Sequence, residues 1–165
     1  MNGPCNRKVL ECGGCDTAFG PPDGIENAIK PCKSNAVRKR CHAGLAQVSE
    51  MAASGESFNL CLKNFLDGFY FKPTVEALQP EPPRLADKNP RFGEIEDAYL
   101  AATAEWLAWK YDLRPPSWIF DPNRALRRPW FASSLSALRA VLLIESPAPF
   151  RSRNLFVSEN ALTRA

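Results

Sequence analysis

Proline is the feature that most limits what this chain can fold into. The 165 residues include 15 prolines, about 9% of the chain against an average near 5%. A proline inside a helix removes a hydrogen bond and clashes with the preceding turn, so helices should end where prolines stand. No segment of five or more residues alternates convincingly between apolar and polar side chains, so strands are not expected. We predict an all-α fold, a compact bundle of five to seven helices with proline-terminated corners.

Two segments carry the strongest helical patterns. From Ser57, a suitable N-cap, to about Phe71, apolar residues recur at helical spacing and a proline follows the end. Residues 93 to 111 begin with acidic side chains, which the helix dipole favours there, and are apolar around most of the helix. We expect this second helix to be central, with Trp106 and Trp109 in the core.

Shorter helices are expected in the second half of the chain. Asp or Ser followed by proline is a start signal, because the side chain caps the helix and proline needs no amide donor at the first position. The proline-rich residues 79 to 90 are expected to be a connector. One predicted helix covers residues 121 to 128, and a second runs from Ser133 or Ser134 to about Glu145. A turn is expected after Ser146-Pro147 and a last turn from Ser158. The apolar residues of the second helix are Leu135, Leu138, Val141, Leu142 and Ile144.

Residues 1 to 50 differ in composition from the rest. They hold five of the six cysteines and the only histidine, and no helical or strand period runs through residues 1 to 30. We predict an irregular, dispensable Cys-rich arm at 1–50 and a helical domain at 51–165. Because Met51 stands where the composition changes, translation from an over-called start is one interpretation of the arm. A loosely ordered segment and a metal-bound subdomain are the others.

Cys12 and Cys15 form the only motif with a chemical rationale. Two thiolates separated by two glycines can bind one tetrahedral Zn²⁺, and Cys32 and Cys41, with His42, would complete the site. Eight residues separate the second pair, whereas zinc ribbons and fingers have a second compact pair. We therefore expect no cofactor, with a zinc-stabilised small domain as the alternative.

Charge is unevenly distributed along the chain, although the net charge is only +3. Residues 51–112 carry a net charge of −4 and residues 113–165 of +5, and all eight basic residues of the latter are arginine. These arginines would neutralise the acidic central helix, bind an acidic protein, or contact nucleic acid together with aromatic rings. The residues predicted to bind a partner are Arg124, Arg127, Arg128, Trp130, Phe131, Arg151, Arg153 and Asn154.

Motifs of the common enzyme classes are absent from the sequence. It has no GxSxG, no HExxH and no glycine-rich phosphate loop, and one histidine excludes mechanisms that need two. The N-terminus lacks the apolar core of a secretory signal, and the longest apolar runs are five residues, far below the ~20 that span a bilayer. We predict a non-enzymatic cytoplasmic protein, without membrane association, whose cysteines stay reduced.

Five motifs stand out in the part of the chain from Leu60 onward. They are FLDGFY at 65–70, EPP at 81–83, DAYLAATAEWLA at 97–108, RRPWF at 127–131 and LRAVLLIESPAPFRSRNLFVSENAL at 138–162. In these motifs the sequence resembles a family of small uncharacterised bacterial proteins, over about 100 of the 165 residues and none of residues 1–50. Some members resemble the C-terminal part of helix-turn-helix regulators, and others the upstream partner of nucleotidyltransferase-type toxins.

The resemblance implies a bacterial interaction module, the antitoxin-like or regulatory half of a gene pair, with a protein partner that is acidic or toxin-like. It supplies no catalytic residues. A helix-turn-helix is not evident, because the expected helices end in prolines and not in a short glycine turn. The alternative function is a nucleic-acid-binding protein that uses the C-terminal arginines and aromatic residues.

Overall fold

A computed structural model describes residues 44–163 of the chain. This part is mostly helical, as the sequence predicts, and the predicted zinc ligands Cys12, Cys15, Cys32 and Cys41 lie outside it. The α-helices are α1 (Leu45–Ala53), α2 (Phe58–Phe71), α3 (Gly93–Lys110), α4 (Arg139–Glu145) and α5 (Ala148–Arg151). The 3-10 turns are η1 (Ser117–Phe120), η2 (Pro122–Arg124), η3 (Ser136–Leu138) and η4 (Glu159–Leu162).

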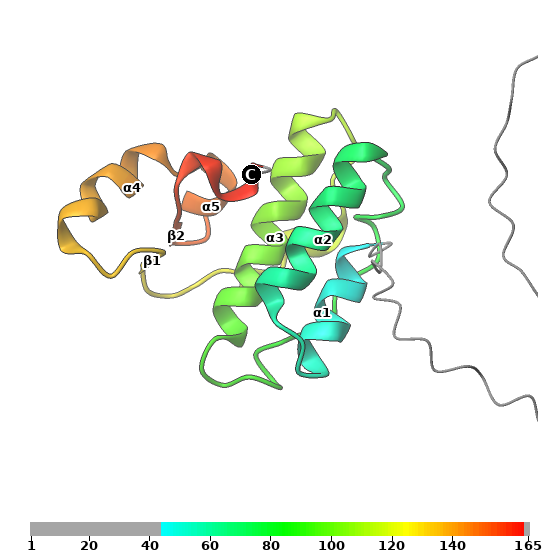
Figure 1. Ribbon diagram of the computed structural model, residues 1–165, viewed down its shortest axis with the longest axis horizontal. Coiled ribbons are helices and arrows are strands. Elements are labelled where there is room, and N and C mark those ends of the chain that lie inside the picture. Colours follow the sequence, from blue (N-terminus) through cyan, green and yellow to red (C-terminus); the bar gives the residue numbers. More distant parts are fainter. Residues whose placement is uncertain (1–43, 164–165) are drawn as a thin grey trace, which may run out of the picture. The chain divides into compact units, whose positions relative to one another are not determined.

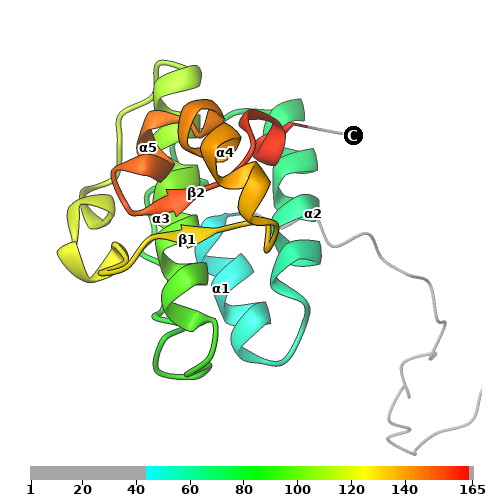
Figure 2. The same ribbon diagram turned by 90° about the vertical axis from the view of Figure 1, so that its left-hand side faces the viewer.

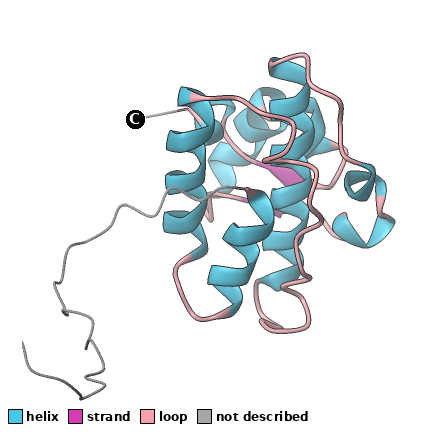
Figure 3. Cartoon of the chain, turned by 90° about the vertical axis from the view of Figure 1, so that its right-hand side faces the viewer, coloured by secondary structure: helices cyan, strands magenta, loops and turns pink. Residues whose placement is uncertain are grey.

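Helices α1, α2 and α3 run side by side (Figures 1 and 3), and they supply most of the buried hydrophobic residues. The stripe of α2 that begins after Ser57 is buried as its spacing predicts, and Cys61 lies within it as a small buried side chain. Phe58 meets the ring of Tyr99 edge-on at 6.1 Å, and Phe69 meets Tyr111 at 5.7 Å. These aromatic contacts hold α2 against the central helix α3.

Helix α1 crosses the domain boundary that the sequence placed between residues 50 and 51. Its side chains Leu45 and Val48 are fully buried in the core, and the Ser49 hydroxyl donates a hydrogen bond to the Pro83 carbonyl oxygen. The sequence signal for this helix is weak, because these two apolar residues are its only buried anchors. Residues 45–50 therefore belong to the helical domain.

A short parallel ladder departs from the predicted all-helical fold. Strand β1 (Trp130–Phe131) pairs with β2 (Leu155–Phe156), and the rings of Phe131 and Phe156 stack with centroids 4.9 Å apart. Figure 2 shows how the ladder brings the segments on either side of α4 and α5 together. With two residues each, these strands are too short to show the alternation that reveals a strand in a sequence.

The predicted helices at 121–128 and 133–145 are shorter in the structure. Asp121 caps the first as expected by accepting a hydrogen bond from the Asn123 amide, but the helix is the single turn η2. The second begins as η3, and only residues 139–145 form α4. The last predicted turn, η4, begins after Ser158 as expected, and Leu162 docks into the core. No helix in residues 44–163 is long and apolar enough to cross a membrane.

Candidate functional site

The eight predicted partner-binding residues fall into three groups in the structure. Arg127, Arg128 and Arg151 are exposed, while Trp130, Phe131 and Asn154 are half-buried. Arg124 and Arg153 lie inside the domain. Only the first two groups can therefore contribute to a surface that a partner touches.

Arg124 belongs to a buried charge cluster that fastens the 79–90 connector to α3. Its guanidinium donates to the Pro82 carbonyl oxygen at 2.6 Å and to Glu81 at 3.3 Å, and it lies 3.9 Å from the carboxylate of Asp97. Asp97 is also fully buried, and it accepts hydrogen bonds from the Leu85 amide and from Arg84. Removing one member of such a pair leaves an uncompensated buried charge, so the cluster is structural.

Arg153 holds η1, α3 and α5 together in the same way. Its guanidinium donates to Glu105 of α3, to the Ile119 carbonyl oxygen at 2.9 Å and to the Pro149 carbonyl oxygen at 2.8 Å. The idea that arginines neutralise the acidic central helix therefore holds for Arg124 and Arg153. Arg127 and Arg128 form no ion pair with the described residues.

Asn154 shapes the backbone beside the β1–β2 ladder. It has a positive φ of 58°, a conformation that asparagine tolerates better than most residues. Its side-chain amide donates to the Leu126 carbonyl oxygen at 2.7 Å, and its own carbonyl oxygen accepts from the Trp130 amide. These bonds are all internal to the domain.

The segment of η3 and α4 exposes most of its apolar side chains. Of the run Val141–Ile144, only Leu142 is buried, and Ile144 is 80% exposed. A helix that is apolar on all sides is normally enclosed by other elements. In Figure 1, α4 instead lies at the edge of the domain. The exposed set, the α4 surface, is Leu135, Leu138, Val141, Leu143 and Ile144.

The α4 surface is fastened to the domain at its end. The buried Ser146 hydroxyl accepts a hydrogen bond from the Val157 amide and lies 2.7 Å from the carbonyl oxygens of Leu142 and Val157, to one of which it donates. At the other end, Arg139 lies over the ring of Phe131, 5.4 Å from its centroid. The apolar surface is thus held in place and not merely frayed from the core.

A second feature is a groove beside the C-terminal half of α3. Its free volume is about 630 Å³, and Trp109 and Phe120 stand exposed at its walls. The sequence placed Trp109 in the core, but it is 79% exposed. Trp106, one turn earlier, is half-buried and packs against the core as predicted.

Two tyrosines beside the core keep their protons to high pH. Burial raises the pKa of Tyr99 to about 12, and burial together with the neighbouring Tyr111 raises the pKa of Tyr70 to about 12. The Tyr70 hydroxyl donates to the Leu162 carbonyl oxygen and so fixes η4 on α2. Within residues 44–163, no group of three or more His, Cys, Asp or Glu side chains could hold a metal ion.

Comparisons of the chain with protein-family models, with curated proteins and with solved structures find no match. The resemblance to antitoxin-like proteins therefore stays a prediction.

Proposed function

We propose that this chain is a non-enzymatic interaction module that binds a protein partner through the α4 surface. One observation supports this most directly: five large apolar side chains are exposed together on a segment of ten residues, 135–144. Contiguous exposed apolar surface of this kind is typical of interaction sites in soluble proteins. Covering these side chains would supply the hydrophobic free energy that the domain itself leaves unused.

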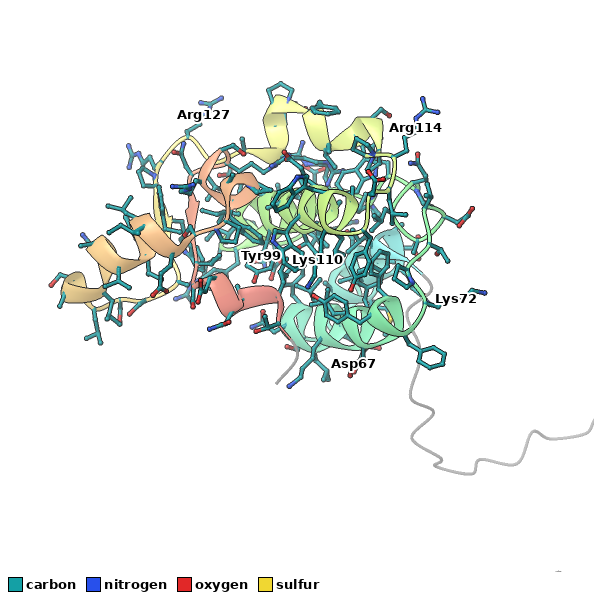
Figure 4. All side chains as sticks on the ribbon, turned by 90° about the horizontal axis from the view of Figure 1, so that it is seen from above. Asp67, Lys72, Tyr99, Lys110, Arg114 and Arg127 are labelled. Atoms are coloured by element: carbon teal, nitrogen blue, oxygen red, sulfur yellow. The ribbon has the colours of Figure 1, made fainter. Side chains whose placement is uncertain are left out.

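The partner we propose has an apolar patch and an acidic rim. Exposed arginines occur before β1, at the start of α4 and in α5, namely at Arg127, Arg128, Arg139 and Arg151. Figure 4 shows the Arg127 side chain directed away from the ribbon. Complementary charge around an apolar centre speeds association and selects the partner, while the apolar centre supplies most of the affinity.

The identity of the partner follows from the sequence resemblance alone. Residues from Leu60 onward resemble bacterial proteins encoded beside nucleotidyltransferase-type toxins, so we propose the antitoxin-like or regulatory half of a gene pair. The protein encoded by the adjacent gene is therefore the first partner to test.

Binding of the adjacent gene's product, measured by titration calorimetry, tests this function. Replacing Ile144 by Asp places a charge at the most exposed side chain of the α4 surface, and we expect affinity to fall more than about tenfold, or 1.4 kcal/mol. Phe71→Asp is the matched control, because Phe71 is equally exposed but lies on α2. Equal binding by both variants would contradict the proposal.

A salt titration of DNA and RNA binding distinguishes the nucleic-acid-binding alternative from the proposed protein-binding function. Phosphate contacts give a steep loss of affinity with salt. If Arg127→Gln/Arg128→Gln abolished tight nucleic-acid binding while Ile144→Asp left it intact, the alternative would replace the proposed function. We expect no such binding, because only four of the six arginines in residues 124–153 are exposed, and four are few for a nucleic-acid surface.

A further inference from the structure

The groove beside α3 has the size and composition of a small-molecule site. It lies between the C-terminal half of α3, the turn η1 and the start of α5, and its free volume of about 630 Å³ falls in the range of 300–1,000 Å³ usual for ligand pockets. Most of its lining is apolar, including Leu113, Ile119 and Pro149. We call it the Trp109 groove.

Two exposed aromatic rings, from two different elements, line this groove. Trp109 comes from α3 and is 79% exposed, and Phe120 comes from η1 and is 71% exposed. Large aromatic side chains usually stabilise a fold by being buried. Because these two rings stay exposed in one groove, the folded domain does not gain that hydrophobic stabilisation. A ligand that packs against the two rings in the groove would recover that burial.

The charged side chains in the lining are all acidic. They are Glu105 and Asp112, and no Lys, Arg or His lines the groove. One oxygen of Glu105 is already bound to Arg153. The Asp112 carboxylate, by contrast, forms no hydrogen bond or ion pair with the residues of 44–163.

The cation nearest along α3 is held elsewhere. The Lys110 ammonium lies 4.5 Å from the ring centroid of Trp106 and 5.4 Å from that of Tyr70, so it sits between α3 and α2 (Figure 4). It therefore does not neutralise Asp112 in the groove. The contact also shows that the aromatic rings of this helix accept an ammonium group at close range.

We propose that the Trp109 groove binds a small organic cation with an apolar body. Its ammonium group lies beside Asp112, and its apolar body packs against Trp109 and Phe120. Charge complementarity with Asp112 favours a cation over a neutral molecule of the same shape and disfavours an anion. The proposal is independent of the proposed function, because the side chains of the α4 surface do not line this groove.

A titration with three ligands of matched shape tests the proposal on the full chain. The probes are 2-phenylethylammonium, the neutral 2-phenylethanol and the anionic 3-phenylpropionate, followed by two-dimensional NMR of the tryptophan indole N–H groups. We expect the cation to shift the Trp109 signal and to bind at least about fivefold tighter than the alcohol, with the anion weakest. Equal affinity for all three, or no saturable shift with the cation, would overturn the proposal.

Two substitutions locate the site. Asp112 has a φ of +50°, which asparagine also tolerates, so Asp112→Asn removes the charge without straining the backbone. It should abolish the preference for the cation over the alcohol, and Trp109→Ala should weaken both at least about fivefold. Glu76→Gln and Phe71→Ala are the matched controls, because both side chains are exposed outside the groove. Unchanged binding in Asp112→Asn, or equal losses in the controls, would refute the assignment.

Discussion

Gly93, the first residue of α3, stands where only glycine fits, because backbone atoms of the 79–90 connector lie against it. A Cβ atom built there would lie 2.3 Å from the Leu85 carbonyl oxygen and 2.6 Å from the Ala86 nitrogen. Real Cβ atoms do not approach this closely, and backbone atoms cannot move aside as a flexible side chain can. The close approach is needed because the 79–90 connector packs directly on the start of α3, where Asp97 accepts the Leu85 amide.

We predict that Gly93→Ala lowers the free energy of unfolding by at least about 2 kcal/mol, because it overpacks the junction of the connector and α3. Helix propensity alone predicts the opposite, since alanine is favoured over glycine by about 1 kcal/mol inside a helix. Denaturant unfolding of the two proteins gives the difference.

The matched control is Gly68→Ala in the interior of α2. Apart from the adjoining backbone of α2 itself, no atom lies within 4 Å of a Cβ at this position, so this change should stabilise the protein by about 0.5–1 kcal/mol. Opposite signs for the two substitutions are the expected result. If Gly93→Ala also stabilised the protein, the connector would not pack on α3 as described.

The buried charges could not have been placed from the sequence. Arg124 and Arg127 stand three residues apart in one arginine-rich stretch, yet Arg124 is fully buried and Arg127 is exposed. The difference arises from Asp97 and Glu81, which lie 27 and 43 positions earlier. A local pattern carries no information on pairing over such separations, and it therefore predicted a shared binding surface for both arginines.

At the scale of elements, helix α2 and helix α3 were predictable and α4 was not. The stripe of α2 and the acidic start of α3 are local signals, and both helices begin and end within two residues of the prediction. The apolar run of α4 predicted the end of the helix at Glu145 correctly. An apolar pattern does not show, however, which neighbours cover a side chain. Whether Leu143 meets the core or solvent depends on where the β1–β2 ladder and Ser146 place the helix.

The candidate surfaces were missed for the same reason. Trp109 was assigned to the core because its helix is apolar around most of its circumference, and Ile144 was identified only as an apolar residue of a helix. An exposed apolar residue becomes a sign of binding only once the structure shows that no neighbour covers it. The sequence could supply the residues of both surfaces but not their exposure.

Two adjacent leucines of α4 test the placement of this helix. Leu142 is 7% exposed and Leu143 is 46% exposed. The same substitution at both positions therefore compares the buried side of α4 with its exposed side. We expect Leu142→Ala to lower the free energy of unfolding by about 2–3 kcal/mol, because it leaves a cavity. Leu143→Ala should change it by less than about 1 kcal/mol and should instead weaken binding to the partner.

Thermal and denaturant unfolding provide the stability measurement, and the calorimetric titration described above provides the binding measurement. We expect Leu142→Ala to lose mainly stability and Leu143→Ala to lose mainly partner binding. If Leu143→Ala destabilised the protein as strongly as Leu142→Ala, Leu143 would be enclosed in the folded domain, and the α4 surface would not exist as described.

At the scale of the whole molecule, the domain is closed by contacts between its first and middle segments. The Leu45 amide donates to the Ala77 carbonyl oxygen at 3.0 Å, and Ser49 bonds the connector at Pro83. The connector in turn carries Pro82 and Leu85, which meet the buried charge cluster and the core. Residues before Met51 therefore complete the same core that α3 organises.

We predict that a chain beginning at Met51 loses cooperative unfolding, whereas a chain beginning at Val37 keeps it. The shorter chain lacks Leu45 and Val48, and large-to-small changes at such buried sites cost about 1–5 kcal/mol each. Domains of this size are stable by only about 5–15 kcal/mol, so losing both side chains and the first turns of α1 removes much of that. Circular dichroism melting of both chains measures the effect. A Met51 chain that melts like the Val37 chain would mean that α1 adds nothing to the core and that the boundary read from composition was correct.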